Sequence, residues 1–362
     1  MLLTTILWAT IGCGLILAGY YYYYFNAAMQ PKTQEITQAL EPVTLLICVK
    51  NNINQVKQNL PSWCEQNFPD YEVIVIDDHS TDGLSVYLET MQPVYPNLCC
   101  YTAPDGIKDA PGKKAALQFG LLQARNPWIL MTDADCKPSS TLWIQQMMDA
   151  RSQPKTQCVL GYSPLQKTAS LLSRWMTFET SWVAIQYLGF ARKGEAYMGV
   201  GRNLLIKRDI ALTAELHLEI ASGDDDFLVQ AVKPNCIDIC IHPQAWTRTS
   251  APDNWTSWWK RKTRHSRTAL IYPGKIRLKL ALISASLGIY YLGLITLLLT
   301  WHGWWTVMIW ILCTMIVLPV RYPLIRKLEI PRFTWWWAEP LLVLAYGLVG
   351  LRMLFQSRKT WN

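Results

Sequence analysis

The stretch Trp128-Ile129-Leu130-Met131-Thr132-Asp133-Ala134-Asp135 joins an uninterrupted apolar run to two carboxylates. The apolar run predicts a buried strand. In an open α/β sheet, ligands bind beyond the carboxyl ends of the strands, which is where Asp133 and Asp135 fall. Two acids separated by one residue can both approach one hard divalent cation, which prefers oxygen ligands. A solvated turn is the alternative for such a pair taken alone. The stretch predicts an α/β sheet with a candidate metal site at its edge.

Two similar runs lie upstream of this stretch. Residues 43–49 read as a buried strand followed by Lys50, and residues 71–76 read as a second strand followed by Asp77-Asp78. A short helix around residues 61–66, with its proline in the first turn, would complete a parallel strand–helix–strand unit. The polar residues after each strand are then expected at one sheet edge. The alternative for residues 77–83 is a turn with a helix cap, because Asp, Ser and Gly are common turn residues.

Two further polar motifs follow along the chain. Pro111-Gly112-Lys113 leads into a predicted helix that runs through Leu122, and a lysine at a helix N-terminus suits an anionic ligand. The spacing excludes a P-loop, and a simple helix cap is the alternative. The acids Asp224-Asp225-Asp226 directly precede the apolar residues 227–229, which argues against an ordinary solvated turn. Grouped acids of this kind hold a metal or move a proton.

The composition predicts membrane helices on both sides of this polar region. Hydrophobic residues make up 51% of the 362 residues and charged residues only 17%, below the roughly 25% of a typical soluble protein. Residues 2–25 carry no charge and predict a membrane anchor, with a cleaved signal peptide as the alternative. The 41 uncharged residues 280–320 are too long for one span, so His302-Gly303 is expected to divide them into two.

A last span is predicted over residues 333–355, after a basic loop at residues 321–332. Glu339 and Arg352 are expected near its ends, where a side chain reaches the interface. The predicted domains are an anchor at 1–28, an α/β domain at 40–270 and three membrane helices at 278–356. Residues 168–192 form either an interfacial helix or a helix that packs between domains.

Charge and cysteine usage indicate the environment. The net charge is +8, and residues 255–279 contain eight Lys or Arg and no acid. A solvated loop or a nucleic-acid patch is possible for such a stretch, but the apolar run that follows favours the cytoplasmic flank of a membrane helix, and no nucleic-acid partner is expected. The ten cysteines show no zinc-type pair, and several lie in apolar runs, so reduced thiols are expected.

The order of these motifs resembles family 2 membrane glycosyltransferases of the GT-A fold, a group that includes processive polysaccharide synthases and ceramide glucosyltransferase-like enzymes. The resemblance covers about residues 43–270. It implies a Rossmann-like, mostly parallel α/β domain combined with transmembrane helices. The motifs that carry it are Val43 to Asn52, Asp77-Asp78-x-Ser80-x-Asp82, Gly112-Lys113-x-Ala115-Ala116-Leu117, Asp133-x-Asp135, Gly199-x-Gly201-Arg202-Asn203, Ser222-Gly223-Asp224-Asp225-Asp226-Phe227-Leu228 and Arg261-x-x-Arg264-His265.

The resemblance implies a role for each motif. By this resemblance, Asp133 and Asp135 hold Mg²⁺ or Mn²⁺ on the diphosphate of the nucleotide sugar. Asp225 is the general base. Similar processive enzymes carry Gln-x-x-Arg-Trp where this chain has Arg261-Lys262-Thr263-Arg264-His265. The missing tryptophan favours transfer of one or a few sugars over synthesis of a long polymer. The full nucleotide-sugar-binding group is Cys48, Lys50, Asp78, Lys113, Asp133, Arg261 and Arg264.

The sequence therefore predicts a metal-dependent, inverting glycosyltransferase. Its donor would be a UDP- or GDP-sugar, and its acceptor would be lipid-linked or membrane-associated. The enzyme is expected as a multi-pass protein of the cell inner membrane, with its catalytic domain in the cytoplasm. The alternatives are a processive polysaccharide synthase, a catalytically inactive scaffold of an envelope-assembly complex and a nucleotidyltransferase.

Overall fold

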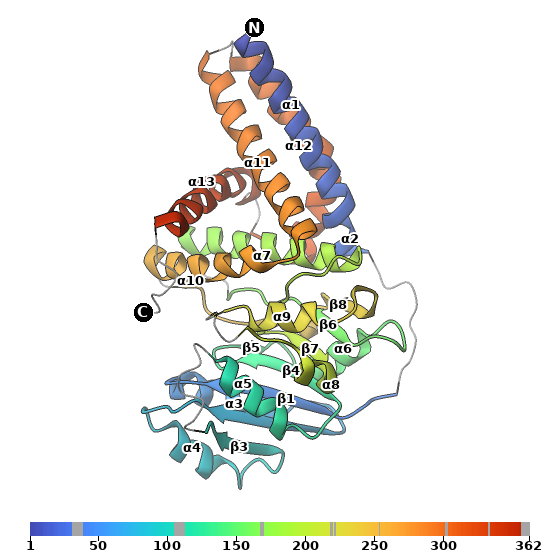
Figure 1. Cartoon of the computed structure of the whole chain (residues 1–362), viewed down its shortest axis with the longest axis vertical. Coiled ribbons are helices and arrows are strands. Elements are labelled where there is room, and N and C mark those ends of the chain that lie inside the picture. The colour runs from blue at the N-terminus through green and yellow to red at the C-terminus, as the bar shows by residue number, and fades with distance from the viewer. Residues whose placement is uncertain are drawn as a thin grey trace. The chain divides into compact units, whose positions relative to one another are not determined.

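The computed structural model describes residues 1–30, 39–104, 113–166, 170–217, 220, 222–252, 254–300, 303–331 and 334–355. The chain divides into two compact units, whose elements are labelled in Figure 1. The α/β unit contains residues 32–166 and 194–251. The helical unit contains residues 1–31, 167–193 and 252–362. The domain boundaries expected from the sequence differ from this division at residues 167–193 and 252–270, which belong to the helical unit.

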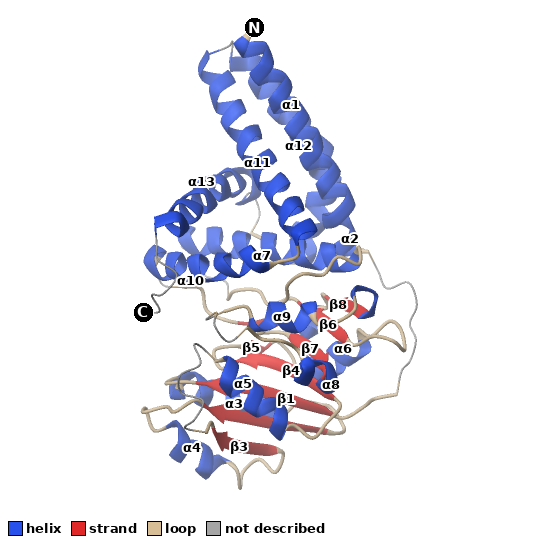
Figure 2. Cartoon of the chain, viewed as in Figure 1, coloured by secondary structure: helices blue, strands red, loops and turns tan. Residues whose placement is uncertain are grey.

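A seven-stranded sheet forms the centre of the α/β unit (Figure 2). The four strands on one side of it are parallel, β7 runs antiparallel to both of its neighbours, and β6 and β8 are parallel to each other. The expectation of a mostly parallel α/β sheet is confirmed. The strand order is β3 (Leu98–Thr102), β2 (Tyr71–Asp77), β1 (Val43–Val49), β4 (Trp128–Asp133), β7 (Leu204–Lys207), β6 (Cys158–Gly161) and β8 (Ile237–Cys240).

The central strands are buried on both faces, as their continuous apolar runs require. Alternate side chains of β1 and β2, such as Leu45 and Val73, lie in one core with side chains of α3 (Ile53–Cys64), α4 (Leu84–Met91) and α6 (Trp143–Asp149). The opposite face packs against α5 (Lys114–Gln123), where Gly120 lies so close to Leu46 and Ile76 that a Cβ would collide with them. Helices therefore cover both faces of the sheet.

The register of the parallel strands brings the predicted polar ends together. Cys48 on β1 is the cross-strand partner of Ile76 on β2 and of Asp133 on β4. The carboxyl ends of these three strands consequently meet at one sheet edge, as the sequence predicts. Three shorter elements complete the unit, namely α8 (Arg208–Thr213), α9 (Asp224–Gln230) and a two-stranded sheet of β5 (Lys137–Pro138) and β9 (Thr247–Arg248).

One local expectation for the α/β unit is wrong. The first helix begins at Ile53 rather than near Pro61, which lies inside α3 and not in its first turn. The Asp82 carboxylate accepts a hydrogen bond from the Ile53 backbone N–H at 2.8 Å, and this contact from 29 residues away satisfies the helix start.

The sequence predicts β1, β2 and β4 and gives no prediction for β3, β6, β7 and β8. Strand β3, with the pattern Leu98-Cys99-Cys100-Tyr101-Thr102, is short and only half-buried at the sheet edge.

The helical unit contains three helices that are long and apolar enough to cross a membrane, among the residues the structure describes. They are residues 2–29, which comprise α1 (Leu2–Tyr20), a π-helical turn and α2 (Asn26–Met29), then α11 (Gly274–Thr300), and residues 304–327 within α12 (Gly303–Lys327). His302, at the expected division point, lies outside the described residues. The last predicted span forms α13 (Thr334–Phe355) and is not one of these three.

Two expectations about charges in the helical unit are wrong. Residues 321–327 are not a loop, because α12 continues through Lys327. Glu339 does not reach an interface. Its side chain is buried, and its carboxylate accepts hydrogen bonds from Arg321 at 2.6 Å, from Tyr291 at 2.7 Å and from Tyr21. The ion pair allows Arg321 to stay in an apolar helix instead of ending it.

The predicted helix around residues 168–192 is present as α7 (Leu171–Arg192) and belongs to the helical unit. The Ser170 side chain caps its start by accepting a hydrogen bond from the Ser173 backbone N–H. Glu179 in α7 is fully buried. It forms an ion pair with Lys262 at 2.6 Å and accepts a hydrogen bond from Tyr346 of α13. All ten cysteines are free thiols, as their spacing predicts.

Candidate active site

The acids in the turn after β2 have different surroundings. The Asp77 carboxylate is buried and accepts a hydrogen bond from the Ser80 backbone N–H, and Asp82 caps α3. These two residues therefore fulfil the turn-and-cap alternative. Asp78 is different, because its carboxylate lies 3.3 Å from the ammonium of Lys50, whose side chain is 60% exposed. Asp78 of this turn and Lys50, which follows β1, thus form a pair that remains open to a ligand.

Cys48 lies in β1 between Asp78 and Asp133. The pKa of its thiol is raised to about 12, chiefly by burial; Lys113 opposes this rise, and the acids Asp224, Asp133 and Asp78 add to it. The thiol is therefore protonated at neutral pH and acts as a small apolar group with a weak hydrogen-bond donor. It can line a nucleotide pocket but cannot act as a nucleophile.

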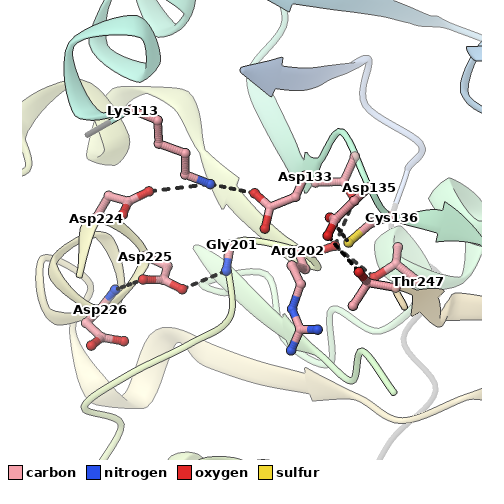
Figure 3. A network of polar contacts seen from close by, with 12 residues as sticks. Lys113, Asp133, Asp135, Cys136, Gly201, Arg202, Asp224, Asp225, Asp226 and Thr247 are labelled. Carbon is pink, nitrogen blue, oxygen red and sulfur yellow. Dashed lines mark hydrogen bonds and ion pairs between the residues drawn. The ribbon is translucent and has the colours of Figure 1, made fainter. Parts of the chain in front are cut away.

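Lys113 is the centre of the site's charge network (Figure 3). It immediately precedes α5, and its ammonium lies 2.6 Å from an Asp133 carboxylate oxygen and 3.6 Å from an Asp224 oxygen. Burial alone would lower the pKa of Lys113, but the two carboxylates raise it well above its ordinary value. Lys113 is therefore a permanent cation that joins the end of β4 to the start of α9. Gly112, predicted to start this helix, lies outside the described residues.

The predicted metal ligands lie together at the end of β4. The ligand atoms of Asp133, Asp135 and Cys136 lie within 4.8 Å of one another. Asp135 accepts a hydrogen bond from the Thr249 hydroxyl at 2.8 Å, which orients its carboxylate, and a weaker one from the Cys136 thiol. Burial raises the pKa of the Cys136 thiol well above its ordinary value, and the neighbouring acids add to this rise. Because that thiol stays protonated, the donor set is two carboxylates, which suits a hard cation such as Mg²⁺ or Mn²⁺.

The three acids at the start of α9 have different surroundings. Asp224 and Asp226 are buried, and Asp224 faces Lys113. Asp225 is half-buried, and its carboxylate accepts hydrogen bonds from the Gly201 backbone N–H at 2.8 Å and from its neighbour's N–H. Burial, followed by the charge of Asp224, raises the pKa of Asp225 to about 6, although Lys113 and the Gly201 N–H oppose the rise. Asp225 combines partial exposure with a basicity suited to proton transfer near neutral pH, whereas Asp224 and Asp226 are buried.

The turn before β7 presents Gly201 and Arg202 to this network. The Arg202 carbonyl accepts hydrogen bonds from the hydroxyls of Thr132 and Thr247, at 3.0 and 2.8 Å. The fully buried Asn203 donates to the carbonyls of Tyr162 and Ala245. These contacts hold the turn rigidly beside the acids. The sequence motif Gly199-x-Gly201-Arg202-Asn203 does not by itself predict a role for Arg202, since nothing local distinguishes a buried arginine from an exposed one.

The structure thus brings seven of the nine predicted site residues into the α/β unit, around the carboxyl ends of β1, β2 and β4. They are Cys48, Lys50, Asp78, Lys113, Asp133, Asp135 and Asp225. The remaining two, Arg261 and Arg264, lie on α10 (Trp255–Thr268) in the helical unit. Their assignment to the donor stays a prediction.

Comparison with known proteins agrees with this geometry. Residues 44–212 match the model of glycosyl transferase family 2. A probable glycosyltransferase, YdaM of Bacillus subtilis, is 24% identical over 260 residues, which are 70% of this chain and 61% of that protein. Poly-beta-1,6-N-acetyl-D-glucosamine synthase of Staphylococcus epidermidis is 24% identical over 169 residues, 45% of this chain and 39% of the synthase. The chain therefore spans about three fifths and two fifths of the length of these curated relatives.

A solved structure shares the fold over nearly the whole chain. The mannosyltransferase PcManGT from Pyrobaculum calidifontis, in complex with GDP-Man and Mn²⁺, superposes with a TM-score of 0.64 at 15% identity and covers 98% of both chains. The α/β unit has the GT-A fold, and residues 44–212 of the chain are similar to glycosyl transferase family 2.

Proposed function

We propose that this protein is a membrane-bound, metal-dependent, inverting glycosyltransferase that moves a sugar from a nucleotide-sugar donor to a lipid-linked or membrane-associated acceptor. The observation that carries the proposal is the single charge network that runs from Asp133 through Lys113 to Asp224, with Asp225 beside it. This network supports the assignment of a diphosphate-binding edge and a basic carboxylate to one site. The family match to residues 44–212 supports the same reaction class.

The donor occupies the edge formed by β1, β2 and β4 in this proposal. Asp133 and Asp135 hold Mg²⁺ or Mn²⁺, which when bound neutralises the diphosphate leaving group. Mn²⁺ accompanies GDP-Man in the mannosyltransferase of the same fold. Cys48, Lys50 and Asp78 contact the nucleoside, and Lys113 adds a fixed positive charge beside the diphosphate. The donor is a UDP- or GDP-sugar.

Asp225 acts as the general base. It accepts the proton of an acceptor hydroxyl while that oxygen forms a bond to the anomeric carbon. The bond between this carbon and the diphosphate oxygen breaks, and its electron pair leaves with the nucleoside diphosphate, so the configuration inverts. The Gly201 N–H and the Asp226 N–H fix the two carboxylate oxygens in place. With a pKa of about 6, Asp225 is ionised at neutral pH and still basic enough to accept a proton.

The proposed location is the bacterial inner membrane, with the catalytic unit in the cytoplasm. Three apolar helices of spanning length and a basic run at residues 255–279 support a membrane location with this orientation. Ten free thiols support a reducing compartment for the α/β unit.

A screen of UDP- and GDP-sugars with membranes that contain the full chain tests the function. Turnover is expected with Mg²⁺ or Mn²⁺ and is expected to stop when EDTA removes the metal. Asp225→Asn should lower transfer by about 10²–10⁴-fold and leave donor binding unchanged, because the amide keeps the hydrogen bond from Gly201 but cannot accept the proton.

Asp209→Asn is the matched control, because Asp209 is an exposed acid on α8 in the same unit. Normal transfer by Asp225→Asn would refute the base assignment. Product length separates the two main readings of the reaction. One or a few added sugars support the proposal, whereas long chains support a processive polysaccharide synthase.

A further inference from the structure

The site contains a buried arginine, Arg202, to which the proposed reaction gives no role. Its side chain is only 9% exposed. Among the described residues, one of its terminal guanidinium nitrogens, Nη1, is buried without a hydrogen-bond partner. Figure 3 shows the guanidinium extending away from Lys113 and Asp133, outside the network of dashed contacts. A buried N–H group without an acceptor is costly, which points to a ligand that supplies one.

Hydrogen bonds fix the backbone on both sides of Arg202. Its carbonyl receives two buried hydroxyl hydrogen bonds, from Thr132 and Thr247. The preceding residue, Gly201, donates its N–H to Asp225, and the following residue, Asn203, is anchored by its side chain. The guanidinium is therefore presented from a rigid turn whose other contact is the proposed base.

This position favours the acceptor over the donor as the source of the anion. The donor diphosphate already has Lys113 and the metal-binding pair Asp133 and Asp135. Arg202 instead follows the residue that orients Asp225, the carboxylate that receives the acceptor's proton. A planar guanidinium with several N–H donors matches the oxygens of a phosphate or carboxylate.

We propose that Arg202 binds an anionic group, a phosphate or carboxylate, on the acceptor close to its reacting hydroxyl. This inference rests on the proposed function, since it assigns the second substrate of the same site. It makes the enzyme selective for acidic acceptors and keeps neutral sugar or lipid hydroxyls from reacting at full rate.

The test compares wild type, Arg202→Gln and Arg202→Lys as full chains in detergent. Calorimetry measures the affinity for Mg²⁺ with UDP or GDP first, and then the affinity for inorganic phosphate and for acetate with that complex saturated. Arg202→Gln is expected to lose about tenfold or more in affinity for the anion, with Arg202→Lys in between. Nucleoside diphosphate affinity should stay within about twofold of wild type. Arg125→Gln is the charge control, because Arg125 is exposed and already paired with Glu72.

Thermal unfolding guards against a folding defect. Arg202→Met should be at least as heat-stable as wild type without ligand, because it removes a buried guanidinium nitrogen that has no hydrogen-bond partner. Phosphate should raise the melting temperature of wild type and not that of Arg202→Met. Each of these results supports the anion site.

Three outcomes are distinguishable. Equal anion affinity in wild type and Arg202→Gln would overturn the inference. A parallel loss of nucleoside diphosphate affinity would assign Arg202 to the donor and overturn the acceptor assignment. If wild type binds no nucleoside diphosphate, the proposed function fails, yet a loss of phosphate binding in Arg202→Gln would still uphold the anion site.

Discussion

At the scale of single residues, three adjacent acids at the start of α9 differ because their partners differ. Asp224 faces the Lys113 ammonium, and Asp225 faces the Gly201 N–H. A carboxylate that is buried next to another carboxylate becomes more basic. The neighbouring charge of Asp224 thus adds to the rise in the pKa of Asp225, the proposed base.

The pH dependence of transfer follows from this tuning. The pKa of Asp225 is raised from its ordinary value to about 6, first by burial and then by Asp224. Since a base must be ionised, we expect the transfer rate to fall as the pH drops below about 6, approaching tenfold per pH unit. A profile of kcat against pH measures this limb. A limb near the ordinary aspartate pKa would contradict the assignment.

A variant of Lys113 offers a second test of the acidic limb of this pH profile. Its positive charge lowers the pKa of Asp225, so Lys113→Met should move the acidic limb to higher pH. The matched control, Lys155→Met, removes an exposed lysine of the same unit and should leave the limb in place. An unchanged limb in Lys113→Met would disconnect this lysine from the base.

At the scale of elements, the turn before β7 depends on a buried asparagine. Asn203 donates to the carbonyls of Tyr162 and Ala245 and accepts a hydrogen bond from the Trp143 indole N–H at 2.9 Å. It thereby ties β7 to the ends of neighbouring elements and sets the position of Gly201 and Arg202. The Asn of this motif is structural, while its Gly and Arg face the site.

Asn203→Ala should therefore destabilise the α/β unit by about 3 kcal/mol, because it leaves one indole N–H and two carbonyls buried without partners. Thermal or denaturant unfolding of the full chain in detergent measures the change. Asn126→Ala is the matched control, since the half-buried Asn126 makes one hydrogen bond, to the Val43 carbonyl, and should cost about 1 kcal/mol. Equal effects of the two variants would refute the bracing role.

At the scale of the whole molecule, the helical unit contains a buried ion pair that links α12 to α13. Arg321 and Glu339 lie 18 residues apart and approach to 2.6 Å, with Tyr21 and Tyr291 completing the carboxylate's hydrogen bonds. The pair couples the N-terminal helix to three C-terminal helices. Such a pair holds helices in one arrangement more than it adds net stability.

Glu339→Leu should destabilise the protein by about 3–5 kcal/mol, because it leaves Arg321 charged and unpaired among apolar helices. The double variant Arg321→Leu/Glu339→Leu should lose much less than the sum of the two single variants. Melting temperatures in detergent complete this double-mutant cycle. Strictly additive losses would show that the two side chains do not interact.

The local pattern of the chain determined the strands and the acids that end them. The runs at residues 43–49, 71–76 and 128–132 form β1, β2 and β4 because a continuous apolar segment of that length must be buried. Asp133 and Asp135 follow directly as the candidate metal ligands. These features depend on neighbours in the sequence, so a linear pattern predicts them.

The tertiary structure alone decided which distant groups meet. The start of α3 depends on Asp82, the buried Arg321 depends on Glu339, and Asp225 receives its hydrogen bond from Gly201. Lys113 joins Asp133 to Asp224, which lie more than ninety residues apart along the chain. Charges and hydrogen bonds act over a few ångströms in space, and the order of strands in the sheet determines which side chains come that close.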